Sequence, residues 1–221
     1  MIKLQLPSLA QGGLWNIIHP GWRELHEKYL EDYQWFVKID DDAYFNAHNF
    51  KFVVRSLDYR APHYLGHTQH HLYPRLFNLG AGHAISQGTL RTLGPHLPSA
   101  DPSQDKPGFT CSRRHTWAED VEFSHCLATA HVDKVTSSRD ALQRESFVAF
   151  TPRDALVTVR RPDSVSWFWK NKPKGLGSGA TCCSPRPVLF HGLKVSQGQA
   201  AHMRWIDFFI SHCQVDPLSA A

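Results

Sequence analysis

The sequence predicts a mixed α/β domain in which helices and strands alternate along the chain. Helix-length amphipathic segments flank a compact apolar run at 35–39, and short apolar runs separated by Pro- and Gly-containing turns follow in the second half. This alternation is typical of a twisted sheet with helices packed on it. With 221 residues, 42% hydrophobic and 20% charged, the chain can form one folded domain with a sizeable core.

The first part of the chain predicts two helices around a buried strand. Large apolar side chains recur at helical spacing over residues 20–33, where Pro20 suits a first turn. The apolar run 35–39 predicts a buried strand that ends in three aspartates. A second helix is expected over about 46–58, with Asn46 near its start.

The middle of the chain predicts a strand, a turn, a helix and a loop. A short strand is expected at 64–65. Gly80-Ala81-Gly82 predicts a turn that leads to a helix, capped by Ser86 and reaching about Leu97. Residues 98–115 are rich in Pro, Ser, Asp and Gly and predict a loop.

The second half begins with the pattern Thr116-Trp117-Ala118-Glu119, which has the form of a capping box and predicts that a helix opens there. Short apolar segments follow, with a flexible connector among them. These segments lie at 147–150, 156–159, 167–169 and 188–190, and the connector at 172–179.

Composition excludes several classes of protein. The net charge of +4 is mild and the basic residues are scattered, so a nucleic-acid partner is not expected. The sequence contains no run of about 18 apolar residues, so no membrane span is expected. The five cysteines form no pair of C-x-x-C knuckles, which argues against structural zinc. They are either free thiols or, in an oxidising compartment, Cys111 and Cys126 staple a loop onto the following helix.

The acidic triplet Asp40-Asp41-Asp42 is the main chemical feature. Like charges so close repel unless a cation neutralises them. On an extended chain Asp40 and Asp42 would share one side and reach a common divalent ion, whereas Asp41 would point away. The alternative is a solvated acidic turn or a cluster at a helix start, and the triplet alone does not decide between them.

Other candidates each have a structural alternative. Asp120 is a candidate general base, whereas Glu119 next to it is expected to complete the capping box. His191 follows an apolar run and would complete an Asp/His metal site, or is an ordinary hydrogen-bonded histidine. Trp167, Phe168 and Trp169 would form a sugar-stacking wall or pack in the core. A denser group in a predicted loop lacks a ligand pattern for zinc: His63, His67, His70 and His71.

Taken together, seven segments resemble the β1,3-glycosyltransferase family that includes fringe and the core 1 β1,3-galactosyltransferases. The most specific is YLEDYQWFVKIDDDAYF, which is similar to the metal-binding segment of that family. The others follow in the family's order: HYLGH, NLGAGHAIS, AEDVEFSHCL, RESFVAFTP, WFWKN and TCCSPRPVLFHGLK. Ala43 replaces the family's usual Thr, and His83 replaces an aromatic residue. The adjacent cysteines before the F-H pair resemble the core 1 enzymes more than fringe.

The resemblance implies a glycosyltransferase-A-like, Rossmann-type mixed sheet flanked by helices, with the first strands missing from an N-terminally truncated chain. Residues 1–195 would be the catalytic domain and 196–221 a C-terminal extension. Asp40, Asp42 and His191 would hold manganese, and Asp120 would be the catalytic base. Residues expected near donor or acceptor are Lys38, Asp41, Gly80, Ala81, Gly82, Glu119, Trp167 and Trp169.

The reaction implied is inverting transfer of galactose from UDP-galactose to the 3-hydroxyl of GalNAc-O-Ser/Thr on glycoproteins. Alternatives are a fringe-like hexosyl or N-acetylglucosaminyl transferase, or a non-catalytic folding partner. The family is Golgi-lumenal and type II, attached to the membrane by an upstream anchor, and a homodimer is a candidate assembly. That compartment favours disulfides: Cys111 with Cys126 first, then a vicinal Cys182–Cys183 bridge, which leaves Cys213 unpaired.

Overall fold

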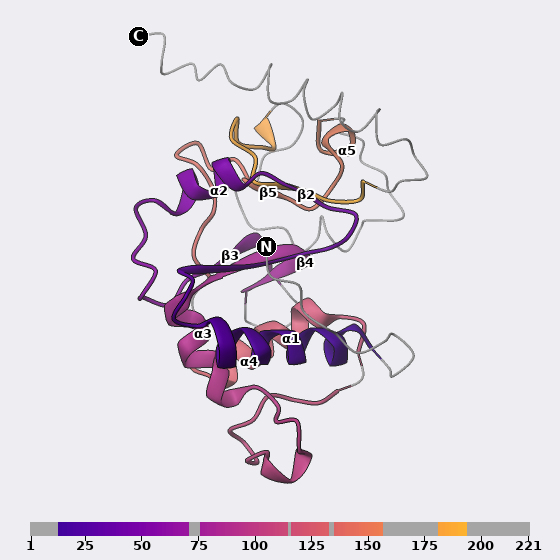
Figure 1. Cartoon of the computed structure of the whole chain (residues 1–221). Coiled ribbons are helices and arrows are strands. Elements are labelled where there is room, and N and C mark those ends of the chain that lie inside the picture. Colours follow the sequence, from indigo (N-terminus) through magenta and orange to yellow (C-terminus); the bar gives the residue numbers. More distant parts are fainter. Residues whose placement is uncertain (1–12, 71–75, 115, 133–134, 157–180, 194–221) are drawn as a thin grey trace.

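The computed structural model describes residues 13–70, 76–114, 116–132, 135–156 and 181–193 (Figure 1). It confirms the mixed α/β class. The elements in chain order are α1 (Leu14–Tyr29), β1 (Trp35–Ile39), β2 (Tyr44–Phe45), α2 (Ala47–Val54), β3 (Tyr64–His70), β4 (Leu76–Ser86), α3 (Gln87–Leu93), α4 (Glu119–Thr129), β5 (Phe147–Val148), α5 (Pro152–Leu156) and β6 (Leu189–Phe190), with 3₁₀ turns at Gly94–His96 and Pro102–Gln104.

The described strands form two small sheets. The first has the order β1-β4-β3 and is antiparallel throughout. The second has the order β2-β6-β5, in which β6 runs antiparallel to β2 and parallel to β5. Helices α1, α3 and α4 cover one face of the first sheet, and the second sheet lies on its other side (Figure 1).

The alternation of side chains along β3 and β4 divides the core between these two faces. Tyr64 and Ile85 pack with α1, α3 and α4, whereas their neighbours Leu65 and Ala84 pack toward α2, β5 and β6. All four side chains are buried. The first sheet is therefore covered on both faces. Its strand β1 ends at Ile39, directly before the acidic triplet.

Helix α1 begins six residues before the predicted start, so placing Pro20 in a first turn was wrong. Pro20 lies inside the helix, where its ring removes one backbone hydrogen bond. The extra turns are held by tertiary contacts: Trp15 is fully buried, its indole N–H donates to the Ser112 carbonyl, and its ring packs against Phe123. Burial of Trp15 thus outweighs the local cost of the proline.

Two predicted helix starts are confirmed by their capping side chains. Asn46 accepts a hydrogen bond from the Asn49 backbone N–H at the start of α2, and Ser86 accepts one from the Thr89 N–H at the start of α3. Both helices end earlier than predicted, because α2 stops at Val54 and α3 passes into a 3₁₀ turn at Gly94.

The predicted turn at Gly80-Ala81-Gly82 is wrong, because these residues lie within β4. The ladder is nevertheless irregular there: Gly66 pairs with His83 and Thr68 with Asn78, which leaves His67 opposite residues 79–82. The glycines therefore mark a bulge in a strand. The same pairing makes β3 longer than predicted and places His67 in a strand, not a loop.

The predicted capping box at Thr116–Glu119 is also wrong. Helix α4 begins at Glu119 with Ala118 as its cap residue, and the Thr116 hydroxyl accepts a hydrogen bond from the Ala118 N–H instead. Glu119 points away from the helix start because its carboxylate pairs with Lys38 on β1.

None of the helices in the described ranges is long and apolar enough to cross a membrane.

Candidate functional site

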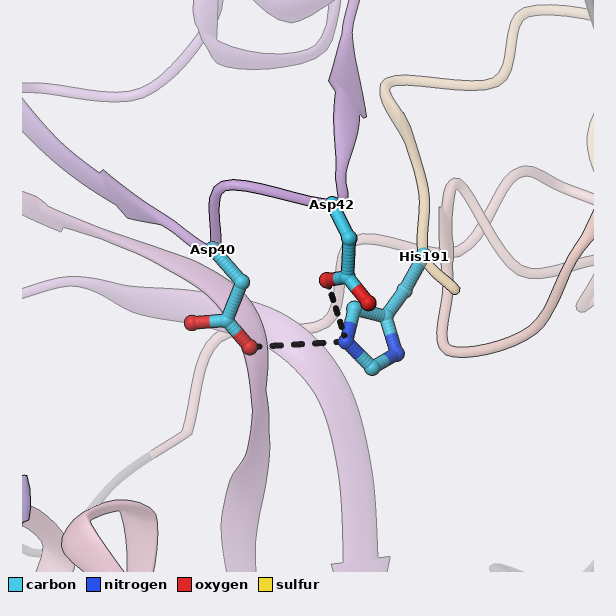
Figure 2. Close-up of side chains that lie close together, drawn as sticks. All are labelled: Asp40, Asp42 and His191. Atoms are coloured by element: carbon cyan, nitrogen blue, oxygen red, sulfur yellow. Dashed lines mark ion pairs between the residues drawn. The ribbon is translucent and has the colours of Figure 1, made fainter. Parts of the chain in front are cut away.

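Three side chains with metal-ligating atoms converge beside the end of β1. Asp40 and Asp42 lie between β1 and β2, and His191 follows β6 (Figure 2). The Nε2 atom of His191 lies 3.0 Å from Oδ1 of Asp42 and 3.4 Å from Oδ2 of Asp40. One ligand atom from each residue lies within 4.8 Å of the others, and each side chain is partly exposed. The arrangement brings two oxygens and one nitrogen around one point.

The two carboxylates converge through a turn, not through an extended chain as the sequence suggested. The Ala43 backbone N–H donates to the Asp40 carbonyl over 3.1 Å, which closes a four-residue turn. Asp41, in the middle of this turn, is exposed and lies outside the group of three. The turn thus achieves the separation of Asp41 from its neighbours that strand alternation was expected to produce.

His191 reaches the acidic turn because β6 pairs with β2, the strand that follows the turn. Tyr44 is opposite Phe190 in this ladder, and the Leu193 backbone N–H donates to the Asp42 carbonyl over 2.8 Å. Segments about 150 residues apart in sequence are therefore joined on both sides of His191.

Gly82 permits the close approach of the second sheet to the first. A Cβ atom at Gly82 would lie 2.2 Å from Cδ1 of Leu189 on β6. Gly82 is also opposite Ile39, the last residue of β1, so the close contact lies beside the acidic turn. Ala81, next to it, is buried, and its carbonyl accepts a hydrogen bond from the Asp40 N–H. Gly80 lies in the same strand.

The charges of the site are mutually stabilised. Burial alone would raise the pKa of Asp40, but hydrogen bonds with His191 and Lys38 lower it overall. The hydrogen bond to Asp40 and the charge of Asp42 raise the pKa of His191. The two carboxylates beside His191 therefore favour positive charge at this point, as a cation site requires.

Lys38 connects the acidic turn to helix α4. Its Nζ atom lies 2.6 Å from Oδ1 of Asp40 and 2.6 Å from Oε1 of Glu119. Burial raises the pKa of Glu119 above its usual value, and the charge and hydrogen bond of Lys38 oppose that shift. Lys38 and Asp40 are two residues apart at the end of a strand, so the period of two was the sequence signal for this contact. The expectation that Lys38 and Glu119 lie near substrate stays a prediction.

The other predicted residues lie in different situations. Asp120 is in the first turn of α4, partly exposed, directly after the Glu119 that Lys38 binds. Trp167, Trp169 and the extension 196–221 lie outside the described residues. The structure joins Cys111 to Cys126 and Cys182 to Cys183 in disulfides, the first of which ties the loop before α4 to the helix itself.

The donor set fits a hard or borderline divalent cation. Carboxylate oxygens suit magnesium and manganese, and one imidazole among them favours a transition metal such as manganese. Among the described residues the site has no cysteine ligand, which distinguishes it from structural zinc sites with four cysteine and histidine ligands.

Comparison with known proteins confirms the resemblance to glycosyltransferases. The chain is 28% identical over 190 residues to glycoprotein-N-acetylgalactosamine 3-beta-galactosyltransferase 1 of Xenopus laevis, and the aligned region makes up 85% of this chain and 48% of that protein. It is also 30% identical over 114 residues to chondroitin sulfate synthase 3 of human and of mouse. That aligned region makes up 47% of this chain and 12% of those proteins. The chain thus spans about half the length, or less, of these relatives. No protein-family model matches it.

Proposed function

On the premise that this chain is a homologue of glycosyltransferases, we propose that it carries the metal-binding part of an inverting β1,3-galactosyltransferase. The donor would be UDP-galactose and the acceptor the 3-hydroxyl of GalNAc-O-Ser/Thr on glycoproteins. The observation that carries the proposal is the convergence of Asp40, Asp42 and His191, because their ligand atoms lie within 4.8 Å of one another.

In this proposal Asp40, Asp42 and His191 hold Mn²⁺. When bound, the ion would neutralise the charge that develops on the departing diphosphate. His191 must be neutral to ligate it, so the ion would replace the proton that the two carboxylates stabilise. The acidic turn and the segment after β6 are hydrogen-bonded to each other through Asp42 and Leu193, which presents the ligands with little rearrangement.

Asp120 is the proposed general base. Its carboxylate would take the proton of the acceptor 3-hydroxyl as that oxygen forms a bond to C1 of galactose on the face opposite UDP, which leaves with the bonding electron pair. Asp120 directly follows Glu119, which Lys38 joins to Asp40 through two ion pairs. This position close to the proposed metal site supports the role. Its partial exposure leaves it accessible to an acceptor.

We place the reaction in the Golgi lumen, an oxidising compartment. The two disulfides support this placement, since such bonds persist where thiols are not kept reduced.

The test is an assay of the protein, with any flanking coding sequence included, against a panel of UDP-sugars and a GalNAc-Ser/Thr peptide. We expect galactose transfer that requires Mn²⁺ and stops with EDTA. Asp120→Asn should lower kcat by about 10²–10⁴-fold with little change in stability. The matched control is Asp154→Asn, which changes another acid in the first turn of a helix and should leave kcat unaltered.

Transfer of a different sugar, or transfer to a different acceptor, would replace the proposal with a second candidate. The similarity to chondroitin sulfate synthase 3 favours this alternative, a hexosyltransferase with another donor and acceptor. The panel should therefore include UDP-N-acetylhexosamines, UDP-glucuronic acid and a chondroitin oligosaccharide. No transfer from any donor, together with no response to Mn²⁺, would reject both candidates.

A further inference from the structure

We infer that Lys38 and Glu119 form a positioning pair for the metal ligand Asp40, and do not contact substrate. This inference rests on the proposed metal site. Both side chains are nearly inaccessible, with 10% of Lys38 and 2% of Glu119 exposed. The two hydrogen bonds that the Lys38 ammonium group donates to Asp40 and Glu119 are both 2.6 Å long, so the group is bound by side chains of the protein.

The pair gives the two oxygens of Asp40 different partners. Lys38 binds Oδ1, whereas Oδ2 faces His191 at 3.4 Å. The Asp40 carboxylate is thereby held in one orientation before any ion arrives. Groups that orient a metal ligand from outside the coordination sphere typically change metal affinity by about 10–100-fold when they are removed.

The charge of Lys38 alone does not explain why this residue lies beside the proposed metal site. An ammonium group beside a site for a divalent cation repels that cation, which weakens binding. The carboxylate of Glu119 compensates this charge from the other side of Lys38. Positioning and simple electrostatics therefore predict opposite results. Removal of Lys38 weakens metal binding if the residue orients Asp40, and tightens it if the residue acts only through its charge.

The pair also sets the spacing between the acidic turn and helix α4. Glu119 is the first residue of α4, and Asp120 follows it. A single ammonium group thus joins Asp40 to the helix that carries the proposed base. Loss of the pair should affect both metal affinity and kcat, although only the first is needed for the test.

The experiment measures Mn²⁺ affinity by isothermal titration calorimetry, and stability by urea unfolding, on the same preparations. We expect Lys38→Met to weaken Mn²⁺ binding by about 10–100-fold. Glu119→Gln should also weaken it, because Lys38 then loses the ion pair that holds it beside Asp40. In a Lys38→Met background, however, Glu119→Gln should have no further effect on Mn²⁺ affinity, since the ammonium group through which Glu119 acts on Asp40 is gone.

The double variant also covers the case in which Lys38→Met folds poorly. It leaves no unpaired buried charge, and replacing both members of a buried ion pair is often tolerated. The control is Arg139→Met, which breaks the Arg139–Glu145 pair, a pair with the same exposed fractions of 10% and 2%. It should lower stability and leave Mn²⁺ affinity unchanged.

The outcomes separate the two proposals. If the unsubstituted protein does not bind Mn²⁺, the proposed metal site is wrong and this inference fails with it. If it binds Mn²⁺ and Lys38→Met binds as tightly or more tightly, only the positioning role is overturned. If Arg139→Met weakens binding as much as Lys38→Met does, the effect is a general result of lost stability, and the positioning role is again overturned.

Discussion

At the scale of single residues, chemistry is concentrated in a few side chains whose neighbours in sequence behave differently. Asp40 and Asp42 face His191, whereas Asp41 between them is exposed and outside the group. Glu119 is buried against Lys38, whereas Asp120 beside it is partly exposed. Adjacent acids therefore differ in their surroundings: one of each pair belongs to the cluster around His191 and Lys38, and its neighbour faces solvent.

Asp42→Asn should remove most of the response to Mn²⁺. A ligand at 100 times its Kd stabilises a folded protein by about 2.7 kcal/mol, and each tenfold loss of affinity lowers that by about 1.4 kcal/mol. Thermal unfolding with and without Mn²⁺ measures the difference. Asp41→Asn is the control, because it removes the same charge from the next residue of the turn. Equal losses in the two variants would mean that the turn attracts cations only by its net charge.

At the scale of elements, the site depends on how closely β6 approaches β4 and the acidic turn. Gly82 allows this approach, and the β2–β6 ladder and the Leu193–Asp42 hydrogen bond maintain it. The apolar residues of β6 are buried, so the strand is held in place by packing as well as by pairing. His191 is positioned as the continuation of that strand.

Gly82→Ala should destabilise the protein by about 1–3 kcal/mol and weaken Mn²⁺ binding, because its methyl group would overlap Leu189. The overlap is with a side chain, so Leu189→Ala in the same protein should recover part of the Mn²⁺ affinity.

Gly88→Ala is the contrasting control for this pair of changes. A Cβ atom there would lie 2.0 Å from the Arg60 carbonyl oxygen, which is backbone and cannot be trimmed by substitution. We expect it to lower the urea midpoint without rescue by Leu189→Ala. Recovery of Gly88→Ala by that substitution would show that the rescue is not local to β6.

At the scale of the whole molecule, two layers pack on opposite faces of one antiparallel sheet (Figure 1). The layer of α1, α3 and α4 contains an aromatic core in which His83, Trp22 and Phe123 each stack against the other two. Burial lowers the pKa of His83 well below its usual value. His19, on the same helix as Trp22, has its pKa lowered to about 4 by burial and by the charges of Arg113 and Arg23.

Stability should therefore fall as the pH falls from about 6.5 toward 4. In that range the unfolded state binds a proton at His19 that the folded state does not, so protons favour unfolding. Above pH 6.5 the contribution of His19 to stability is fully present. The loss from His19 is on the order of 3 kcal/mol. His19→Gln should flatten the curve of urea midpoint against pH, and His48→Gln, on the exposed surface, should not. Identical slopes in all three proteins would contradict the assignment to His19.

Local sequence signals by themselves determined several parts of this protein. The apolar run before Asp40 predicted β1, the apolar run before His191 predicted β6, and Asn46 and Ser86 predicted two helix starts. Each of these depends on interactions within a few residues, such as strand burial or a capping hydrogen bond. The ordered motifs also predicted the resemblance to glycosyltransferases that the comparisons confirm.

Only the tertiary structure decided which distant residues meet. The start of α1 depends on the burial of Trp15, and the partner of Glu119 is Lys38 from another element. The need for glycine at position 82 comes from the approach of Leu189. Propensity and capping patterns describe the cost of local conformations, whereas these contacts gain their energy from burial and charge pairing across the chain. The sequence alone therefore predicted the residue types of the site, and long-range packing determined their geometry.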